Sequence, residues 1–194
     1  MLICVTNRKL CKDYFLNRIE ELAKARPYGI MLREKDLDEA VYEKLAVSVK
    51  KICDIYSIPL IINKRIEIAD KLNLSHVHLS MPDLRKYKNE IEKFQYIGAS
   101  VHSLLEAKEA EKLGATYLVA GHIFSTDCKR NIPPRGLNFL KAICENVKIP
   151  VYAIGGISKD KVEAVKQAGA AGACIMSEAM TCTDPYQLIS DFWN

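Results

Sequence analysis

The sequence lacks the features that would place it in a membrane or on a nucleic acid. No apolar run reaches the roughly 18 residues that a transmembrane helix requires. Lys and Arg are spread along the chain with a net charge of only +4, so no basic block follows a nucleic-acid backbone. The opening MLICVTNRKL has too few apolar residues for a secretory signal and is typical of a first strand. We therefore expect neither a membrane nor a nucleic acid as a partner.

The seven cysteines lack any CxxC spacing, and their number is odd. Cys4 and Cys174 lie inside apolar runs, where a thiol behaves as a small apolar side chain. A disulfide framework is therefore not expected. Reduced thiols of this kind indicate a cytoplasmic protein.

What the sequence does contain is a regular alternation of short apolar runs with helical patterns. Apolar residues make up 49% of the chain and charged residues 27%, which is enough for one domain with a substantial core. The runs expected to be buried strands cover 2–6, 28–33, 59–63, 76–80, 96–100, 116–120, 150–156 and 171–177. Helices are expected at 13–25, 38–56, 65–73, 106–114, 136–146, 158–169 and from about 184 to the end, and a short segment near 83–93 connects the fourth and fifth runs. Ser158 is expected to cap its helix, and Gly114 and Gly169 to end theirs.

This alternation predicts parallel strands with right-handed crossovers, and eight such units close into a barrel. We therefore expect a single-domain (β/α)8 TIM barrel over residues 1–194. The rival architecture is an open doubly wound sheet. That sheet would carry a GxGxxG turn after its first strand, whereas this chain has TNRKLCKD at 6–13.

Polar residues and glycines follow nearly every expected strand at its carboxyl end. They are Thr6, Arg33, Asn63, His78, Ser100, His122, Gly155, Gly156 and Ser177. Arg33, Lys35, Arg65 and Lys129 make this end electropositive. Because a closed parallel barrel places its active site at the carboxyl ends of its strands, the pattern predicts a small-molecule site there.

Two late segments indicate a phosphate site. AIGGIS (153–158) puts Gly155 and Gly156 between a strand and a helix, where backbone N–H groups can approach an anion. IMSEAM (175–180) puts Met176 and Ser177 at the next strand-to-helix turn. The loops after the seventh and eighth strands of these barrels commonly hold phosphate. Glycines also make tight turns, so both interpretations stay open.

His122 stands in GHIFSTDCKR (121–130), directly after an apolar run. An imidazole can accept and return a proton near neutral pH, which makes His122 a candidate general acid/base. The alternative is an interior histidine bonded to a backbone carbonyl. His78 and His102 are weaker candidates for the same chemistry.

Asp83, in HLSMPDL, is the one candidate ligand for Mg²⁺ at a strand end. The position where a second carboxylate would be expected holds Lys64, a cation. Asp127 is expected to cap its loop or to form a salt bridge. We therefore expect no metal and no other cofactor.

Segments spread along almost the whole chain resemble the thiamine phosphate synthase superfamily. They are MLREK (31–35), IINKR (61–65), VHLSMPD (77–83), IGASVHSLLEA (97–107), GHIFSTDCK (121–129), AIGGI (153–157) and IMS (175–177). In the synthases, the segment like IINKR carries a magnesium-binding Asp where this chain has Lys64, and Asp83 matches the second magnesium carboxylate. The synthases also have Gly-Pro where this chain has Gly121-His122, and a second Thr where it has Cys128.

These departures resemble the TenI branch, whose members are thiazole tautomerases. The resemblance implies an isomerase of thiamine biosynthesis that aromatises a thiazole carboxylate phosphate by moving one proton. It implies His122 as the general acid/base and Arg33 as the catalytic cation. Further substrate contacts would come from Lys35, Asn63, Ser100, Ser103, Thr126 and Lys129. Backbone N–H groups of Gly155, Gly156, Met176 and Ser177 would bind the phosphate.

Two other functions stay open. The first is a thiamine phosphate synthase that couples a hydroxymethylpyrimidine diphosphate to thiazole phosphate, against which Lys64 counts. The second is a non-catalytic binder or regulator that keeps only the phosphate site. Tyr87 and Trp193 are the apolar surface residues that point to a homodimer.

Overall fold

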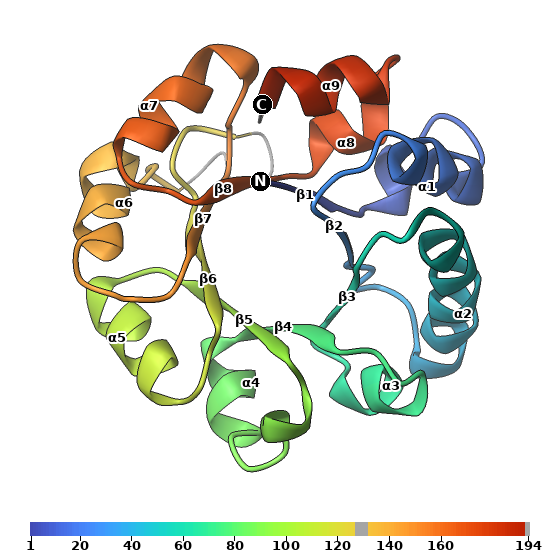
Figure 1. Cartoon of the computed structure of the whole chain (residues 1–194), viewed down its shortest axis with the longest axis horizontal. Helices are drawn as coiled ribbons and strands as arrows, with labels where there is room; N and C mark the ends of the chain where they lie inside the picture. Colours follow the sequence, from blue (N-terminus) through green and yellow to red (C-terminus); the bar gives the residue numbers. More distant parts are fainter. Residues whose placement is uncertain (127–131, 193–194) are drawn as a thin grey trace.

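The fold is a closed barrel of parallel strands surrounded by helices (Figure 1). It is seen in a computed structural model that describes residues 1–126 and 132–192. Within these ranges each strand pairs with its neighbour in sequence, and the last strand pairs with the first. The strands are β1 (Leu2–Val5), β2 (Gly29–Leu32), β3 (Leu60–Asn63), β4 (His76–Ser80), β5 (Tyr96–Val101), β6 (Tyr117–Gly121), β7 (Val151–Ile154) and β8 (Gly172–Ile175). The predicted (β/α)8 barrel is confirmed, and the open sheet is excluded.

The helices follow the strands as expected, with three differences. They are α1 (Phe15–Lys24), α2 (Glu39–Tyr56), α3 (Ile66–Lys71), α4 (Met81–Lys86), α5 (Leu104–Lys112), α6 (Gly136–Cys144), α7 (Val162–Gln167), α8 (Ser177–Thr181) and α9 (Pro185–Phe192). The short segment expected near 83–93 contains most of α4 and the 3-10 turn η2 (Ile91–Lys93). Helix α8 was not predicted, because 177 was taken as the last strand residue. The 3-10 turn η1 (Arg8–Leu10) also was not predicted.

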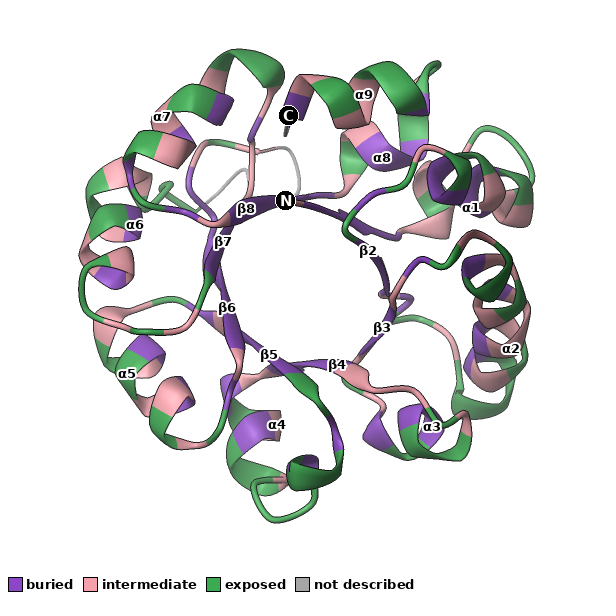
Figure 2. Ribbon diagram, in the orientation of Figure 1, coloured by how far each residue is buried: buried purple, intermediate pink, exposed green. Residues whose placement is uncertain are grey.

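Side chains of the strands alternate between two apolar layers. One layer fills the barrel interior and includes Ile3, Val5, Met31, Tyr117 and Tyr152. The residues between them along each strand face the helices and form the larger outer core. Figure 2 shows the result as a ring of buried strands with helices that are buried on the inner side and exposed on the outer side. This double burial explains why the strands are continuous apolar runs.

Side-chain caps fix where several helices begin. Asp38 accepts a hydrogen bond from Val41 N at 2.8 Å and starts α2. Ser80 and Ser103 cap α4 and α5 in the same way. Ser158 does not act as the expected cap: its hydroxyl donates to Asp160 Oδ1 at 2.6 Å, and a 3-10 turn, η4 (Lys159–Lys161), precedes α7. Gly169 does end α7, with a φ of 92°.

Three expectations about the surface and the thiols can be compared with the structure. Every cysteine within the described ranges is a free thiol, and Cys128 lies outside them. No described helix is both long enough and apolar enough to cross a bilayer. Tyr87 is half-buried beside Lys86, while Trp193 lies outside the described residues, so a homodimer stays a prediction.

Candidate active site

A cavity of about 1550 Å³ opens at the carboxyl ends of the strands, where the sequence predicted a site. It collects residues from loops that are far apart in the chain. The expected site residues that line it are Arg33, Lys35, Asn63, Ser100, His122, Thr126, Gly155, Gly156, Met176 and Ser177. Ser103 is not among them, and Lys129 lies outside the described residues.

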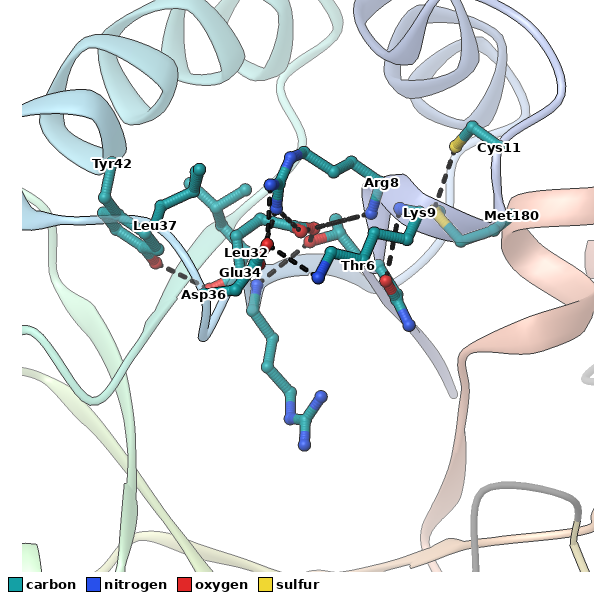
Figure 3. A network of polar contacts seen from close by, with 12 residues as sticks. Thr6, Arg8, Lys9, Cys11, Leu32, Glu34, Asp36, Leu37, Tyr42 and Met180 are labelled. Atoms are coloured by element: carbon teal, nitrogen blue, oxygen red, sulfur yellow. Dashed lines mark hydrogen bonds and ion pairs between the residues drawn. The ribbon is translucent and has the colours of Figure 1, made fainter.

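A polar network ties the loops after β1 and β2 together (Figure 3). Its centre is the buried carboxylate of Glu34, which accepts hydrogen bonds from Thr6 Oγ1 at 2.7 Å, from Arg8 N at 3.0 Å and from Arg8 Nη1 at 3.1 Å. Arg8 also bridges to Asp36 at 2.6 Å, which lowers the pKa of Asp36. Sequence reasoning missed this network, although the pairing of a carboxylate with Arg33 and Lys35 after one strand was a usable signal.

The network positions Arg33. Thr6 Oγ1 accepts a hydrogen bond from Arg33 N at 3.0 Å while it donates to Glu34. Because the Glu34 carboxylate is engaged by Thr6 and Arg8, it does not neutralise the guanidinium of Arg33. That guanidinium reaches across the cavity to within 4.0 Å of the Met176 sulfur atom. Arg33 therefore presents its charge to whatever occupies the cavity.

The end of β3 adds two more cations. Lys64 has a φ of 74°, and its backbone N–H donates to the His78 carbonyl at 2.9 Å. Arg65 is held in place: it donates to the Leu37 carbonyl and stacks 4.6 Å from the Tyr42 ring centre. The β2 and β3 ends thus form a cationic side of the cavity.

The opposite side of the cavity is built from backbone. Gly155 and Gly156 have φ values of 101° and 63°, a region that favours glycine. A Cβ on Gly155 would lie 2.3 Å from His122 Cβ, and one on Gly156 would lie 2.2 Å from the Ser125 carbonyl oxygen. The loop after β7 therefore packs against residues 122–125, which accounts for the glycine pair whether or not it also binds an anion.

His122 is buried within this packing. Its Nε2 donates to the Ile132 carbonyl at 3.1 Å, and its own carbonyl accepts from Arg135 N at 3.0 Å. The backbone-bonded interior histidine that the sequence left as an alternative is therefore present. The ring nonetheless lines the cavity, so its contact with a ligand stays a prediction.

A second buried histidine, His78, forms a polar cluster inside the barrel. Its Nε2 lies 2.8 Å from Ser100 Oγ, and its Nδ1 lies 3.3 Å from the Tyr117 hydroxyl. Burial, helped by the charge of Arg33, lowers the pKa of His78 to about 3, so the ring is neutral at physiological pH. Gly98 makes room for this cluster, because a Cβ there would lie 2.1 Å from the Tyr117 ring. A glycine inside a strand was the signal that could have predicted the close contact.

Of three further polar residues near the strand ends, Asn63 and Glu178 line the cavity and Ser103 does not. The Ser103 hydroxyl accepts a hydrogen bond from Glu106 N at 3.1 Å and serves as the α5 cap. Asn63 lines the cavity and donates to the His78 carbonyl at 3.3 Å. Glu178, which the sequence did not single out, lines the cavity next to Ser177, and burial raises its pKa.

The residues at the β3 and β4 ends do not fit a magnesium site. Mg²⁺ that holds a phosphate is usually bound by one or two carboxylates, and a neighbouring ammonium group opposes it. Asp83 is the carboxylate at the β4 end, and its Oδ2 accepts from Ser80 Oγ at 2.6 Å. The neighbouring β3 end offers Lys64 instead of a second carboxylate. Among the described residues there is also no cluster of three His, Cys, Asp or Glu side chains that could hold a metal ion.

The fold and the cavity define a (β/α)8 barrel whose cavity, at the carboxyl ends of the strands, has cations on one side and a glycine pair on another. A family model described as thiamine monophosphate synthase matches residues 2–179. The chain belongs to this family.

Individual relatives agree with that assignment. The thiamine-phosphate synthase of Clostridium acetobutylicum is 41% identical over 179 residues, covering 91% of this chain and 85% of that protein. The thiamine-phosphate synthase of Syntrophomonas wolfei is 36% identical over 189 residues, covering 94% of this chain and 90% of that protein. A solved structure of thiamine phosphate pyrophosphorylase from Pyrococcus furiosus is 31% identical with a TM-score of 0.87, covering 98% of this chain and 92% of that chain.

The predicted tautomerase function is wrong, and so is the isomerase class that went with it. Relatives at 33–41% identity over more than nine tenths of this chain are named thiamine-phosphate synthase. The prediction relied on one nine-residue loop and on Lys64, whereas the synthase relatives match along nearly the whole chain. Thiamine biosynthesis and the superfamily were predicted correctly.

Proposed function

We propose that this protein is a thiamine-phosphate synthase, a transferase that joins a hydroxymethylpyrimidine diphosphate to a thiazole phosphate and releases pyrophosphate. One observation carries the proposal: the cationic β2 and β3 ends line the same cavity as the glycine pair that follows β7, and β7 is four strands from β3 in the barrel. Two anionic substrates can therefore bind with their uncharged rings between them. The names of the relatives at up to 41% identity support the same reaction.

The diphosphate belongs on the cationic side. A guanidinium donates two parallel hydrogen bonds to phosphate oxygens, which suits Arg33. Lys35 and Asn63 line the same side and would complete the contacts. Lys129 keeps its predicted role as a substrate contact, although it lies outside the described residues.

The thiazole phosphate belongs on the glycine side. Gly155 and Gly156 follow β7, and Met176 and Ser177 follow β8, so their backbone N–H groups can converge on one phosphate. These two loops are the usual phosphate-binding loops of (β/α)8 barrels. Their contacts come from the backbone and therefore do not depend on side-chain charge.

The reaction breaks the bond between the pyrimidine methylene carbon and a diphosphate oxygen, and pyrophosphate leaves with the electron pair. The thiazole ring nitrogen forms the new bond to that carbon with its lone pair. Since this nitrogen carries no proton, the step needs no general base. Arg33 stabilises the negative charge of the leaving group. His122, Ser100 and Thr126 then position the rings.

The direct test is to mix both substrates with the protein and measure thiamine phosphate and pyrophosphate, in magnesium chloride and in EDTA. Equal amounts of the two products are expected. Arg33→Met should lower the rate by roughly 10²-fold, because it removes the charge that meets the leaving group. Arg85→Met is the matched control, since Arg85 is an exposed α4 residue paired with Glu109. Thiazole phosphate binding with no coupling under any of these conditions would contradict the proposal and indicate a binding protein.

A further inference from the structure

The side of the cavity assigned to the diphosphate carries a lysine where a divalent cation would need a carboxylate. We infer that this protein binds the diphosphate through its own cations, with Lys64 and Arg33 supplying the charge in place of a divalent metal ion. The identity of the diphosphate rests on the proposed function. The inference itself concerns a diphosphate group and can be tested without turnover.

The backbone directs Lys64 toward the cavity. Lys64 adopts a φ of 74°, a region that side chains other than Asn, Asp and Gly rarely occupy. Its backbone N–H is bonded to the His78 carbonyl on the neighbouring strand, which fixes the turn between β3 and α3. The side chain is exposed and lines the cavity, and it forms no hydrogen bond or ion pair within the described parts of the chain.

Lys64, Arg33 and Lys35 are cations of this side that line the cavity, and the first two have no carboxylate partner within the described residues. Arg65, by contrast, donates to a backbone carbonyl and covers the Tyr42 ring. Arg33 has no carboxylate partner in the described residues, because Glu34 is engaged by Thr6 and Arg8. The two available cations follow β2 and β3, which are adjacent in the barrel. A diphosphate that bridges these strand ends would meet both charges.

Two carboxylates of this side, Asp83 and Glu67, line the cavity, but they come from different helices and form no metal-binding cluster within the described residues. Asp83 accepts a hydrogen bond from Ser80 at the start of α4, and Glu67 lies exposed on α3. A metal ion between the β3 and β4 ends would lie beside the Lys64 ammonium group, whose repulsion opposes binding. A lysine also binds a phosphate as a point charge without any metal.

Isothermal titration calorimetry with inorganic pyrophosphate tests the inference. The wild-type protein is titrated in EDTA and again in excess magnesium chloride. We expect saturable binding in EDTA, with an affinity at least equal to that in magnesium. Binding that occurs only in magnesium would overturn the inference.

Two substitutions at position 64 sharpen the test, and both tolerate a left-handed backbone. Lys64→Asn removes the charge and should weaken binding in EDTA by at least about tenfold. Lys64→Asp places a carboxylate beside the Asp83 strand end, so its binding should be lost in EDTA and partly restored by magnesium. Lys108→Asn, on the exposed face of α5, is the matched control and should bind as the wild type does. Equal affinity of wild type and Lys64→Asn in EDTA would also overturn the inference.

The result is separable from the proposed function. Metal-free pyrophosphate binding that depends on Lys64, without any coupling activity, would support the inference and contradict the synthase. Coupling together with pyrophosphate binding that requires magnesium would support the synthase and contradict the inference.

Discussion

The two sides of the active-site cavity are built on different physical principles. The charged sector, formed by the ends of β1 to β3, holds its shape through buried and exposed ion pairs around Glu34 and Asp36. The glycine sector, formed by the ends of β6 to β8, holds its shape through backbone contacts that leave no space for a Cβ. The first sector should therefore respond to changes of charge, and the second to changes of volume.

The largest effect is expected in the glycine sector. Gly156→Ala forces an unfavourable φ and puts a methyl group 2.2 Å from the Ser125 carbonyl oxygen. We expect a loss of about 3–4 kcal/mol in the free energy of unfolding, measured in urea, and loss of thiazole phosphate binding.

Gly114→Ala separates conformational strain from steric contact. Gly114 has a φ of 93°, but a Cβ there would meet nothing within 4 Å. The Gly114→Ala variant should lose only about 1 kcal/mol in the free energy of unfolding. Equal losses for the two variants would mean that backbone conformation, and not packing, controls the glycine sector.

The next effect is expected in the charged sector. Glu34→Gln replaces a buried carboxylate that accepts hydrogen bonds from Thr6 and Arg8. The NH₂ group of the glutamine would then face the N–H or O–H group of one of these residues, and no hydrogen bond could form there. We expect a loss of about 2–3 kcal/mol in unfolding free energy and slower coupling, since Arg33 loses its support. Glu109→Gln, in an exposed pair with Arg85, should cost less than about 1 kcal/mol. A loss for Glu34→Gln as small as that for Glu109→Gln would show that the network does not hold the sector.

A pH effect is expected from His78, which lies between the sectors. Its folded pKa of about 3 is below the value of about 6.5 for an unfolded histidine. The unfolded state therefore binds a proton that the folded state does not, so stability is complete above pH 6.5 and is lost as the pH falls toward 3. Between pH 7 and pH 5, wild type should lose about 2 kcal/mol more than His78→Asn in urea unfolding. A His78→Asn slope that matches wild type would contradict a neutral His78.

The smallest effect on the reaction is expected for Ser103, which lies outside the cavity lining. Ser103 was expected to contact the substrate, but its hydroxyl caps α5 and it does not line the cavity. Ser103→Ala should lower unfolding free energy by about 1 kcal/mol and leave the coupling rate unchanged at a temperature where the variant is folded. A severalfold lower coupling rate for Ser103→Ala would show that Ser103 contacts the substrate after all.

The strands were predictable because both of their faces are buried. Eight apolar runs marked them to within two residues at either end, and 171–177 ran too long only because α8 begins at Ser177. The position of the cavity followed from the same pattern, since parallel strands place their carboxyl ends together. The roles of single side chains were less predictable: His122 bonds the Ile132 carbonyl, a partner that no spacing in the sequence specifies. The Ser103 cap, by contrast, follows the S-x-x-E spacing of Ser103 and Glu106, a signal that was overlooked.

The functional assignment depended on how much of the chain was compared with known families. The loop 121–129 and Lys64 favoured a tautomerase, whereas similarity over 91% of the chain supports a synthase. Loops vary more among related proteins than the strands and helices they connect, so nine residues are weaker evidence than similarity along the whole chain. Lys64 is better explained as a change in how the site binds an anion than as a change of reaction.

The sequence by itself determined the closed barrel, the end at which the site lies and its positive charge, because hydrophobic period and strand order depend on residue type alone. Only the tertiary structure decided which of the charged groups are available. The Glu34 carboxylate accepts hydrogen bonds from Arg8 and Thr6. Arg65 donates to the Leu37 carbonyl and stacks on the Tyr42 ring, while Arg33 and Lys64 line the cavity. The physical reason is that the availability of a charge depends on its neighbours in space, and those neighbours come from loops that the chain separates widely.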